Sequence, residues 1–355
     1  LVPIEVLIVE YTFFISTFAL TGTLYAQEPI IIKMGSVIGD GADGRMPLHT
    51  GKIQEQFARM VHEYTNGEVI WENLDGKRPD IPVFIMPGMT AKGDVIQATS
   101  VPSLFMPRVP EMNIQSIPYL FNGDEHVRRY LGSEADKWLS EKVEKTYGVK
   151  VLGSFHHSNA VSINGTTPII EPEDFGGKIL NDFSESWAPM WANIKPIEIT
   201  YMGYAEAAEG KLVDEGATTE VNVAMLQNNH GQRLYERFKH VTLVPNMYNI
   251  YYTILINPGV WNGLTKFQQD GINRAMLDAQ RSSTAQHLDT MMWALQLNQS
   301  EGVKIHFQTS AERKRWKAEF YPKMVKSIVD KSSDPAKTME MIKKIEDLVK
   351  DLEWK

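Results

Sequence analysis

Two adjacent histidines, His156 and His157, are the most obvious pair of side chains that could bind a metal ion. They follow a predicted strand over Lys150 to Phe155, and neighbouring residues of a strand point to opposite faces. The two imidazoles therefore cannot ligate one ion from that strand. The chain also contains no cysteine, which excludes Cys-ligated zinc, iron–sulfur sites and thiol catalysis. The sequence predicts neither a metal site nor a cofactor.

Motifs of enzyme catalysis are absent from the sequence. No G-x-S-x-G, H-E-x-x-H or P-loop pattern occurs. Gly39 to Gly44 formally fits G-x-G-x-x-G, but its two aspartates would repel a pyrophosphate. His157 and Asp182 could form a general acid–base pair, although no pattern requires them to. We therefore expect a protein that is not an enzyme, and turnover of a bound ligand is the observation that would reverse this.

The composition excludes several other classes of protein. The chain has 355 residues, with 36 Lys and Arg against 44 Asp and Glu, so its formal net charge is −8. An acidic chain without a basic run is a poor nucleic-acid binder. The hydrophobic content of 43% is that of a globular protein, and the length suggests two domains.

The first residues have the character of a targeting segment. Val6 to Tyr25 is mostly apolar and is followed by Ala26, which predicts a signal peptide over residues 1–26. The alternative is an uncleaved membrane anchor, although Glu10 would lie inside it. Either segment would export the rest of the chain.

Strand-like and helix-like segments alternate along the first half, in the order βαβαβαβ, which predicts a parallel or mixed α/β sheet. A helix is expected from about Asp124 to Tyr147, where Gly148 ends it. Further along, four short strands are expected, over Lys150 to Phe155, Val161 to Asn164, Val241 to Val244 and Tyr251 to Ile256.

One long helix is expected over residues 265–301. The segment contains no proline and only one glycine, Gly271, and Thr265 to Gln268 has the spacing of a capping box. Such a helix would be roughly 55 Å long, which is longer than a small domain is wide. We therefore expect it to span two domains: residues 27–153 with 245–264, and residues 154–244 with 302–355. Two α/β domains joined in this way would enclose a small molecule between the ends of their strands.

A series of weak motifs, in order, resembles the extracytoplasmic solute-binding proteins of TRAP transporters, the DctP family. The series runs from about Ile30 to Trp316. The motifs are E-Y-T-N-G-E-V from Glu63, V-P-E-M from Val109, I-P-Y-L-F from Ile117, P-E-D-F-G-G-K-I from Pro172, Tyr204 with G-K-L-V-D from Gly210, and Trp261 before the long helix.

The resemblance implies a two-domain α/β fold of the periplasmic-binding-protein type II (Venus-flytrap) class. It also implies a periplasmic protein, expected to be monomeric, that closes around a small organic solute and delivers it to the membrane permease subunits of a TRAP transporter. A periplasmic sensor that presents its ligand to a membrane receptor is the alternative.

This sequence departs from the family where a ligand carboxylate is usually held. The family arginine that follows K-I corresponds to Leu180 or Asn181, and a second family arginine corresponds to Ala160. Neither can fork onto a carboxylate as a guanidinium does. Val221 follows Glu220, so the Glu-Trp pair with which some members hold a metal ion is also missing. We therefore expect a ligand that is not a typical Arg-clamped C4-dicarboxylate.

The family register places the ligand-binding candidates at strand ends near the domain crossings. Aromatic residues would wall or stack on the ligand, amides and hydroxyls would orient it, and the two acidic residues would favour a hydroxylated or cationic compound. The candidates are Phe155, His157, Asn159, Asn181, Asp182, Trp187, Tyr204, Glu220, Asn222 and Tyr248.

Overall fold

The computed structural model describes residues 28–36, 49–74, 83–182, 185–191, 194, 198–200, 220–226, 229 and 233–350. The predicted signal peptide, the loop of residues 39–44 and the candidate Tyr204 lie outside the described residues.

The described strands form one mixed sheet. Its strand order is β2-β1-β3-β8-β4-β7-β5-β6, and β9 pairs with β8. Parallel pairs join β1 to β2 and β3, and β5 to β6 and β7, whereas the middle pairs β3–β8, β8–β4 and β4–β7 are antiparallel. The predicted mixed α/β sheet is therefore confirmed. The strands are β1 (Ile30–Ser36), β2 (Val69–Asn73), β3 (Ala98–Pro102), β4 (Lys150–Gly165), β5 (Ile179–Asn181), β6 (Glu198–Thr200), β7 (Glu220–Met225), β8 (His240–Ile256) and β9 (Lys304–Phe307).

Two long strands, β4 and β8, lie side by side in the middle of the sheet and join its two halves. They contain 16 and 17 residues and pair antiparallel from Lys150↔Ile256 to Gly165↔His240. The prediction of four separate short strands is wrong. Polar residues in the middle of each strand interrupt the apolar pattern, but the backbone stays extended through them.

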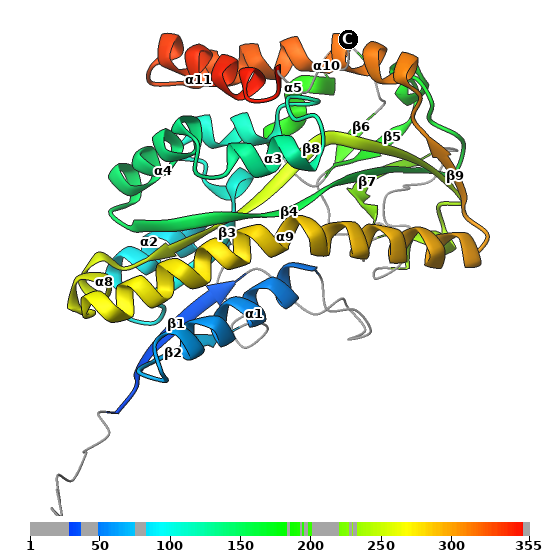
Figure 1. Ribbon diagram of the computed structural model, residues 1–355. Coiled ribbons are helices and arrows are strands. Elements are labelled where there is room, and N and C mark those ends of the chain that lie inside the picture. Colours follow the sequence, from blue (N-terminus) through cyan, green and yellow to red (C-terminus); the bar gives the residue numbers. More distant parts are fainter. Residues whose placement is uncertain are drawn as a thin grey trace, which may run out of the picture.

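The long helix α9 (Lys266–Ser300) is confirmed, and so is its capping box. The Thr265 side chain accepts from the backbone of Gln268, and the Gln268 side chain accepts from the backbone of Thr265. At 35 residues, the helix is about 52 Å long. It runs beside β4, with β1, β2 and α1 (His49–Tyr64) on one side and α10 and α11 (residues 310–347) on the other (Figure 1).

Helix α9 meets α1 at a point of very close approach. A Cβ atom added to Gly271 would lie 2.8 Å from Thr65 Cγ2 and 2.8 Å from the Tyr64 carbonyl oxygen. This contact fixes the α1 side of the molecule to the spanning helix, and only glycine allows it without displacing backbone.

The helix predicted from Asp124 to Tyr147 is in fact two helices, α3 (Asp124–Tyr130) and α4 (Glu134–Tyr147). Gly132 adopts φ 79° between them, and the Ser133 hydroxyl caps α4 by accepting from the backbone of Asp136 at 3.3 Å. The Gly-Ser pair contains both a helix stop signal and a helix start signal, and the expectation of one continuous helix overlooked it.

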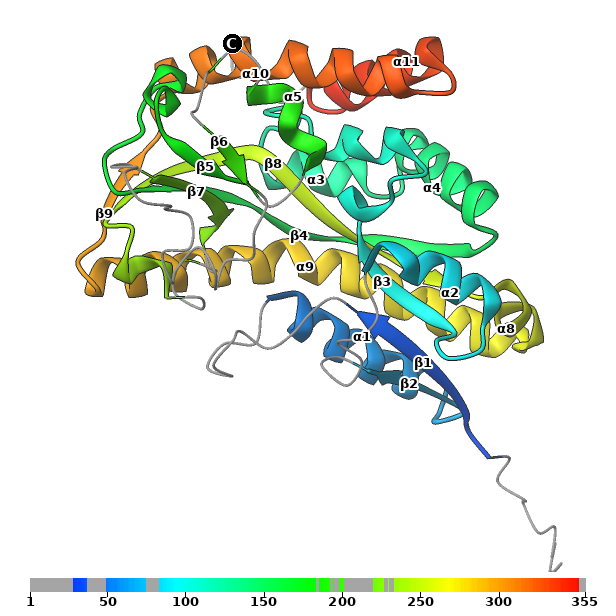
Figure 2. The same ribbon diagram turned by 180° about the vertical axis from the view of Figure 1, so that it is seen from behind.

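Helices α10 (Ser310–Lys331) and α11 (Pro335–Asp347) cover the side of the sheet away from α1, as both views show (Figure 1 and Figure 2). None of the helices among the described residues combines the length and the apolar character that crossing a bilayer requires. The shorter helices are α2 (Met86–Lys92), α5 (Ala188–Trp191) and α8 (Pro258–Gly263), with 3-10 turns η1 (Val83–Ile85), η2 (Ser103–Phe105), η3 (Pro110–Ser116), η4 (Pro172–Phe175), η5 (Glu185–Trp187) and η6 (Leu234–Glu236).

The buried carboxylate of Glu111 joins η3 to α4 and to the turn between α10 and α11. Its Oε1 accepts from Lys142 Nζ at 2.9 Å, from Ser332 Oγ at 2.8 Å and from the backbone of Ser333 at 3.1 Å. Burial alone would raise the pKa of Glu111, but the hydrogen bonds from Lys142, the backbone and Ser332 outweigh it and lower the pKa to about 2.

We expect Gly271→Ala to lower the free energy of unfolding by about 2 kcal/mol, because the added methyl group collides with the backbone of α1. Urea denaturation followed by circular dichroism measures the change. Gly88→Ala in α2 is the matched control, since no atom lies within 4 Å of its added Cβ. Equal urea midpoints for Gly271→Ala and the wild type would contradict the close approach.

We expect Glu111→Gln to lower the free energy of unfolding by roughly 3 kcal/mol at neutral pH, because Lys142 loses its partner. The folded pKa of Glu111 lies below the unfolded value of 4.5. The carboxylate therefore contributes fully above pH 4.5, and its contribution disappears as the pH falls towards 2. Urea midpoints at neutral pH and near pH 3 should thus differ less between variant and wild type at the lower pH. Exposed Glu340→Gln should change little at either pH.

Candidate functional site

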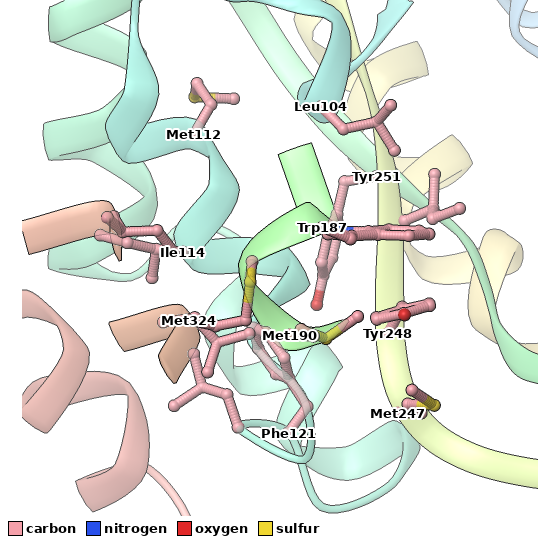
Figure 3. Close-up of a cluster of buried hydrophobic side chains, with 14 of the residues drawn as sticks. Leu104, Met112, Ile114, Phe121, Trp187, Met190, Met247, Tyr248, Tyr251 and Met324 are labelled. Atoms are coloured by element: carbon pink, nitrogen blue, oxygen red, sulfur yellow. The ribbon is translucent and has the colours of Figure 1, made fainter. Parts of the chain in front are cut away.

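Two predicted site residues from distant parts of the chain, Trp187 and Tyr248, lie against one another. Their rings are stacked, with centroids 3.5 Å apart and planes 16° from parallel, and both side chains are fully buried. Figure 3 shows the indole flat against the tyrosine ring, with Met190 and Met247 beside them. Trp187 ends the η5 turn that follows β5, and Tyr248 lies in the middle of β8, so the pair joins one half of the sheet to the long central strand.

Asn181 and Asp182 lie at the carboxyl end of β5, and both are fully buried. Asp182 Oδ2 accepts a hydrogen bond from Trp191 Nε1 at 2.7 Å. Burial raises the pKa of Tyr248 far above its usual value, and the charge of Asp182 contributes to the same shift. An acidic oxygen beside an aromatic stack can accept from a ligand hydroxyl or ammonium group.

Phe155 and His157 lie on β4 around a third aromatic residue, Tyr252. Phe155 is parallel to the Tyr252 ring with centroids 5.9 Å apart, and His157 meets the same ring edge-on at 5.2 Å. Phe155 also belongs to the apolar cluster that includes Ile272 and Ala275 of α9. The structure therefore places Phe155 between the sheet and the spanning helix.

The two histidines of the sequence motif have different neighbours. The His156 ring lies 5.5 Å from that of Tyr251 and 5.2 Å from that of His287, whereas His157 contacts Tyr252. Among the described residues, no group of three or more His, Cys, Asp or Glu side chains is placed to hold a metal ion.

The remaining candidates are placed as follows. Asn159 is buried in a hydrogen-bonded network with α9, where both ends of its amide contact protein groups. Glu220 and Asn222 belong to β7, and their backbones pair with Ile179 and Asn181 of β5. The register thus brings Asn222 beside Asn181.

Leu180, which we expect at the position of a family arginine, lies in an apolar environment. Leu180 is fully buried in the main hydrophobic cluster, and the backbone of Ala160 pairs with that of Pro245. Among the side chains that the structure describes as buried, none is a lysine or an arginine. The described part of the site therefore contains no buried guanidinium that could clamp a carboxylate.

Sequence reasoning did not select Asn249, which follows Tyr248 on β8. Its side chain is fully buried, and neither Nδ2 nor Oδ1 has a hydrogen-bond partner among the described residues. Burying an amide without partners costs about 1–3 kcal/mol, so this amide is suited to a ligand hydroxyl or to a bound water. An isolated asparagine in a strand carries no sequence signal that marks it as a site.

A cavity of about 980 Å³ lies elsewhere, between α10, α11 and the turn at Tyr119 and Asn122. Its lining includes Arg313, Lys317 and Glu346, and none of the predicted site residues contributes to it.

Comparison with known proteins identifies relatives over most of the chain. The family model for bacterial extracellular solute-binding protein, family 7 (DctP), matches residues 42–331. The C4-dicarboxylate-binding periplasmic protein DctP of Rhodobacter capsulatus is 24% identical over 306 residues, which cover 83% of this chain and 85% of that protein.

Solved structures share the fold. A TRAP periplasmic solute-binding protein from Ralstonia eutropha H16, with bound (S)-2-acetolactate, has a TM-score of 0.74 at 21% identity and covers 90% of this chain and 99% of its own. The sugar acid binding protein of Advenella mimigardefordensis, in complex with galactonate, has a TM-score of 0.74 at 20% identity, with coverages of 91% and 99%. These likenesses confirm the type II periplasmic-binding fold predicted from the sequence.

We expect Trp187→Ala to lower the free energy of unfolding by about 3 kcal/mol, because it removes a fully buried indole and its stacking on Tyr248. Urea denaturation measures the loss. Trp293→Ala on α9 is the control, since that side chain is 39% exposed and its removal should cost less than about 1 kcal/mol. Equal losses of unfolding free energy in the two variants would show that the stacked Trp187 stabilises the fold no more than an exposed tryptophan does.

Proposed function

Because the chain belongs to family 7 of the bacterial extracellular solute-binding proteins, the DctP family, we propose that it is a periplasmic protein that captures a small organic solute. In this proposal the solute binds between two lobes, residues 27–153 with 245–264 and residues 154–244 with 302–355, and is delivered to the permease of a TRAP transporter. The observation that supports it most directly is the family match over residues 42–331.

The arrangement of Trp187 and Tyr248 supports a closing mechanism. Trp187 belongs to the second lobe, whereas Tyr248 lies on the segment of β8 where the chain passes to the first. Their stacked rings therefore lie across the boundary between the two proposed lobes. A solute that touches both sides is bound more tightly by the closed state, so its binding shifts the population towards closure.

The ligand in this proposal is a hydroxylated small molecule that is not held by an arginine clamp. Leu180 replaces the clamp, while Asp182 and the amide of Asn249 offer buried acceptors and a buried donor. The galactonate held by the Advenella protein is a compound of this hydroxylated kind. Where such a ligand carries a carboxylate, backbone amides can bind it.

We expect a thermal-shift screen to separate the two ligand classes. Galactonate and neutral polyols at millimolar concentration should raise the melting temperature, whereas succinate and malate should not. A ligand that binds only the folded state stabilises it, and the stabilisation increases with the ratio of ligand concentration to Kd. Native mass spectrometry of the purified protein would identify a ligand that is carried through purification. A large stabilisation by succinate or malate would contradict the ligand class, and stabilisation by no organic solute would contradict the function.

We expect Asp182→Asn to weaken binding of the hydroxylated ligand from that screen by about tenfold, the scale of a charge-assisted hydrogen bond. The fold should change little, since an amide oxygen can still accept from Trp191. Isothermal titration calorimetry measures the affinity, with exposed Asp289→Asn on α9 as the control. An unchanged affinity would exclude Asp182 from the ligand contacts.

A further inference from the structure

The pairing of β4 with β8 is disturbed where the chain passes from one half of the sheet to the other. The ladder is irregular between His156 and Ser158, and again between Ser158 and Ala160. The second irregularity is the larger, because Ser158 pairs with Ile250 whereas Ala160 pairs with Pro245. Residues Asn246–Asn249 therefore leave the ladder opposite Asn159, and we call them the β8 bulge. Tyr248 is part of it.

The β8 bulge begins with a residue in a left-handed conformation. Asn246 has φ 62°, a region that asparagine tolerates better than most residues. Its carbonyl oxygen accepts from the backbone of Tyr119 at 2.9 Å, and its Oδ1 accepts from the backbone of Gly123 at 3.3 Å. The bulge is thereby attached to the turn that precedes α3.

A second set of hydrogen bonds connects the β8 bulge to the spanning helix. Asn159 Nδ2 donates to Asn246 Oδ1 at 2.9 Å and to Asp124 Oδ1 at 3.2 Å, and Asn159 Oδ1 lies 2.6 Å from His287 Nε2 on α9. The side chains of Asn159, Asn246 and His287 are only 6%, 6% and 2% exposed. Burial raises the pKa of Asp124, and the hydrogen bond from Asn159 opposes that shift.

The direction of these bonds gives His287 a specific role. The Asn159 amide nitrogen faces two acceptors, so its oxygen must face a donor, and His287 Nε2–H is that donor. Without this donor, the buried Asn159 oxygen would be left without a partner, which costs about 1–3 kcal/mol. The imidazole on α9 therefore stabilises the network through which Asn159 holds Asn246.

We propose that His287, acting through Asn159, is a positioning residue that holds the β8 bulge where Tyr248 meets Trp187 and thereby sets the equilibrium between open and closed lobes. The inference rests on the proposed function, in which closure is the movement of the two lobes onto the solute. Asn159, Asn246 and His287 would act without contacting the solute.

Pulsed electron paramagnetic resonance on the unliganded chain tests the proposal without any ligand. Because the sequence has no cysteine, spin labels can be attached at Glu63→Cys on α1 and Lys304→Cys on β9, two exposed positions that belong to different proposed lobes. In His287→Leu, which removes the donor, we expect the ratio of long to short inter-label distances to rise about fivefold, the scale of one buried hydrogen bond.

His287→Gln is the matched control, because its amide nitrogen can still donate to Asn159, and its distance distribution should stay close to that of the wild type. Distributions that coincide for the wild type, His287→Leu and His287→Gln, with circular dichroism showing that all are folded, would overturn the proposal. If His287→Leu does not fold, Asn246→Gly decides in the same assay, since it removes the Oδ1 acceptor and keeps the left-handed backbone. A failed ligand screen leaves this result unaffected, so the two proposals can fail separately.

Discussion

The continuous pairing of β4 with β8 is the constraint on which the rest of the structure depends. Strands of 16 and 17 residues form one antiparallel ladder, and the parallel pairs of each half are added at its sides. Any movement of one half against the other must bend this ladder. Because extended backbone bends most easily where ladder hydrogen bonds are interrupted, the closing movement that we propose would bend the ladder at the irregular pairing near Ser158 and the β8 bulge. Helix α9 contacts the same place through His287.

The sequence predicted the elements whose signals are local. The capping box at Thr265 and the absence of proline were enough to predict α9, and the alternation of strands with helices was enough for a mixed sheet. The continuity of β4 and β8 could not be predicted in the same way. The polar residues in the middle of each strand look like a loop, and the partner that makes Asn159 tolerable in the core, His287, lies 128 positions away. A pattern read along the chain contains no information about such a partner.

The sequence allowed candidate site residues to be selected by type, but not their arrangement in space. Trp187 and Tyr248 were selected as aromatic residues near strand ends, and the structure stacks them. Phe155 and Asn159 were also selected for their places near strand ends. The structure places Phe155 beside α9 and Asn159 in the network at the β8 bulge. Asn249 was not selected, because only its burial without partners distinguishes it from other asparagines. Alternation along a strand predicts the face of a side chain, but a bulge changes the face of every residue after it.

The hydrogen bonds at the β8 bulge suit the reversible closing movement that we propose. An ion pair buried at this point would resist separation, because each charge would lose its partner in a medium of low dielectric constant. A purely apolar contact would leave the amides of Asn159 and Asn246 unsatisfied. Hydrogen bonds among Asn159, Asn246 and His287 avoid both problems. Each contributes only a modest net free energy and can be exchanged for a bond to water when the segments separate. Two states connected in this way can differ by a few kcal/mol or less, which is the range in which the binding energy of one small solute decides between them.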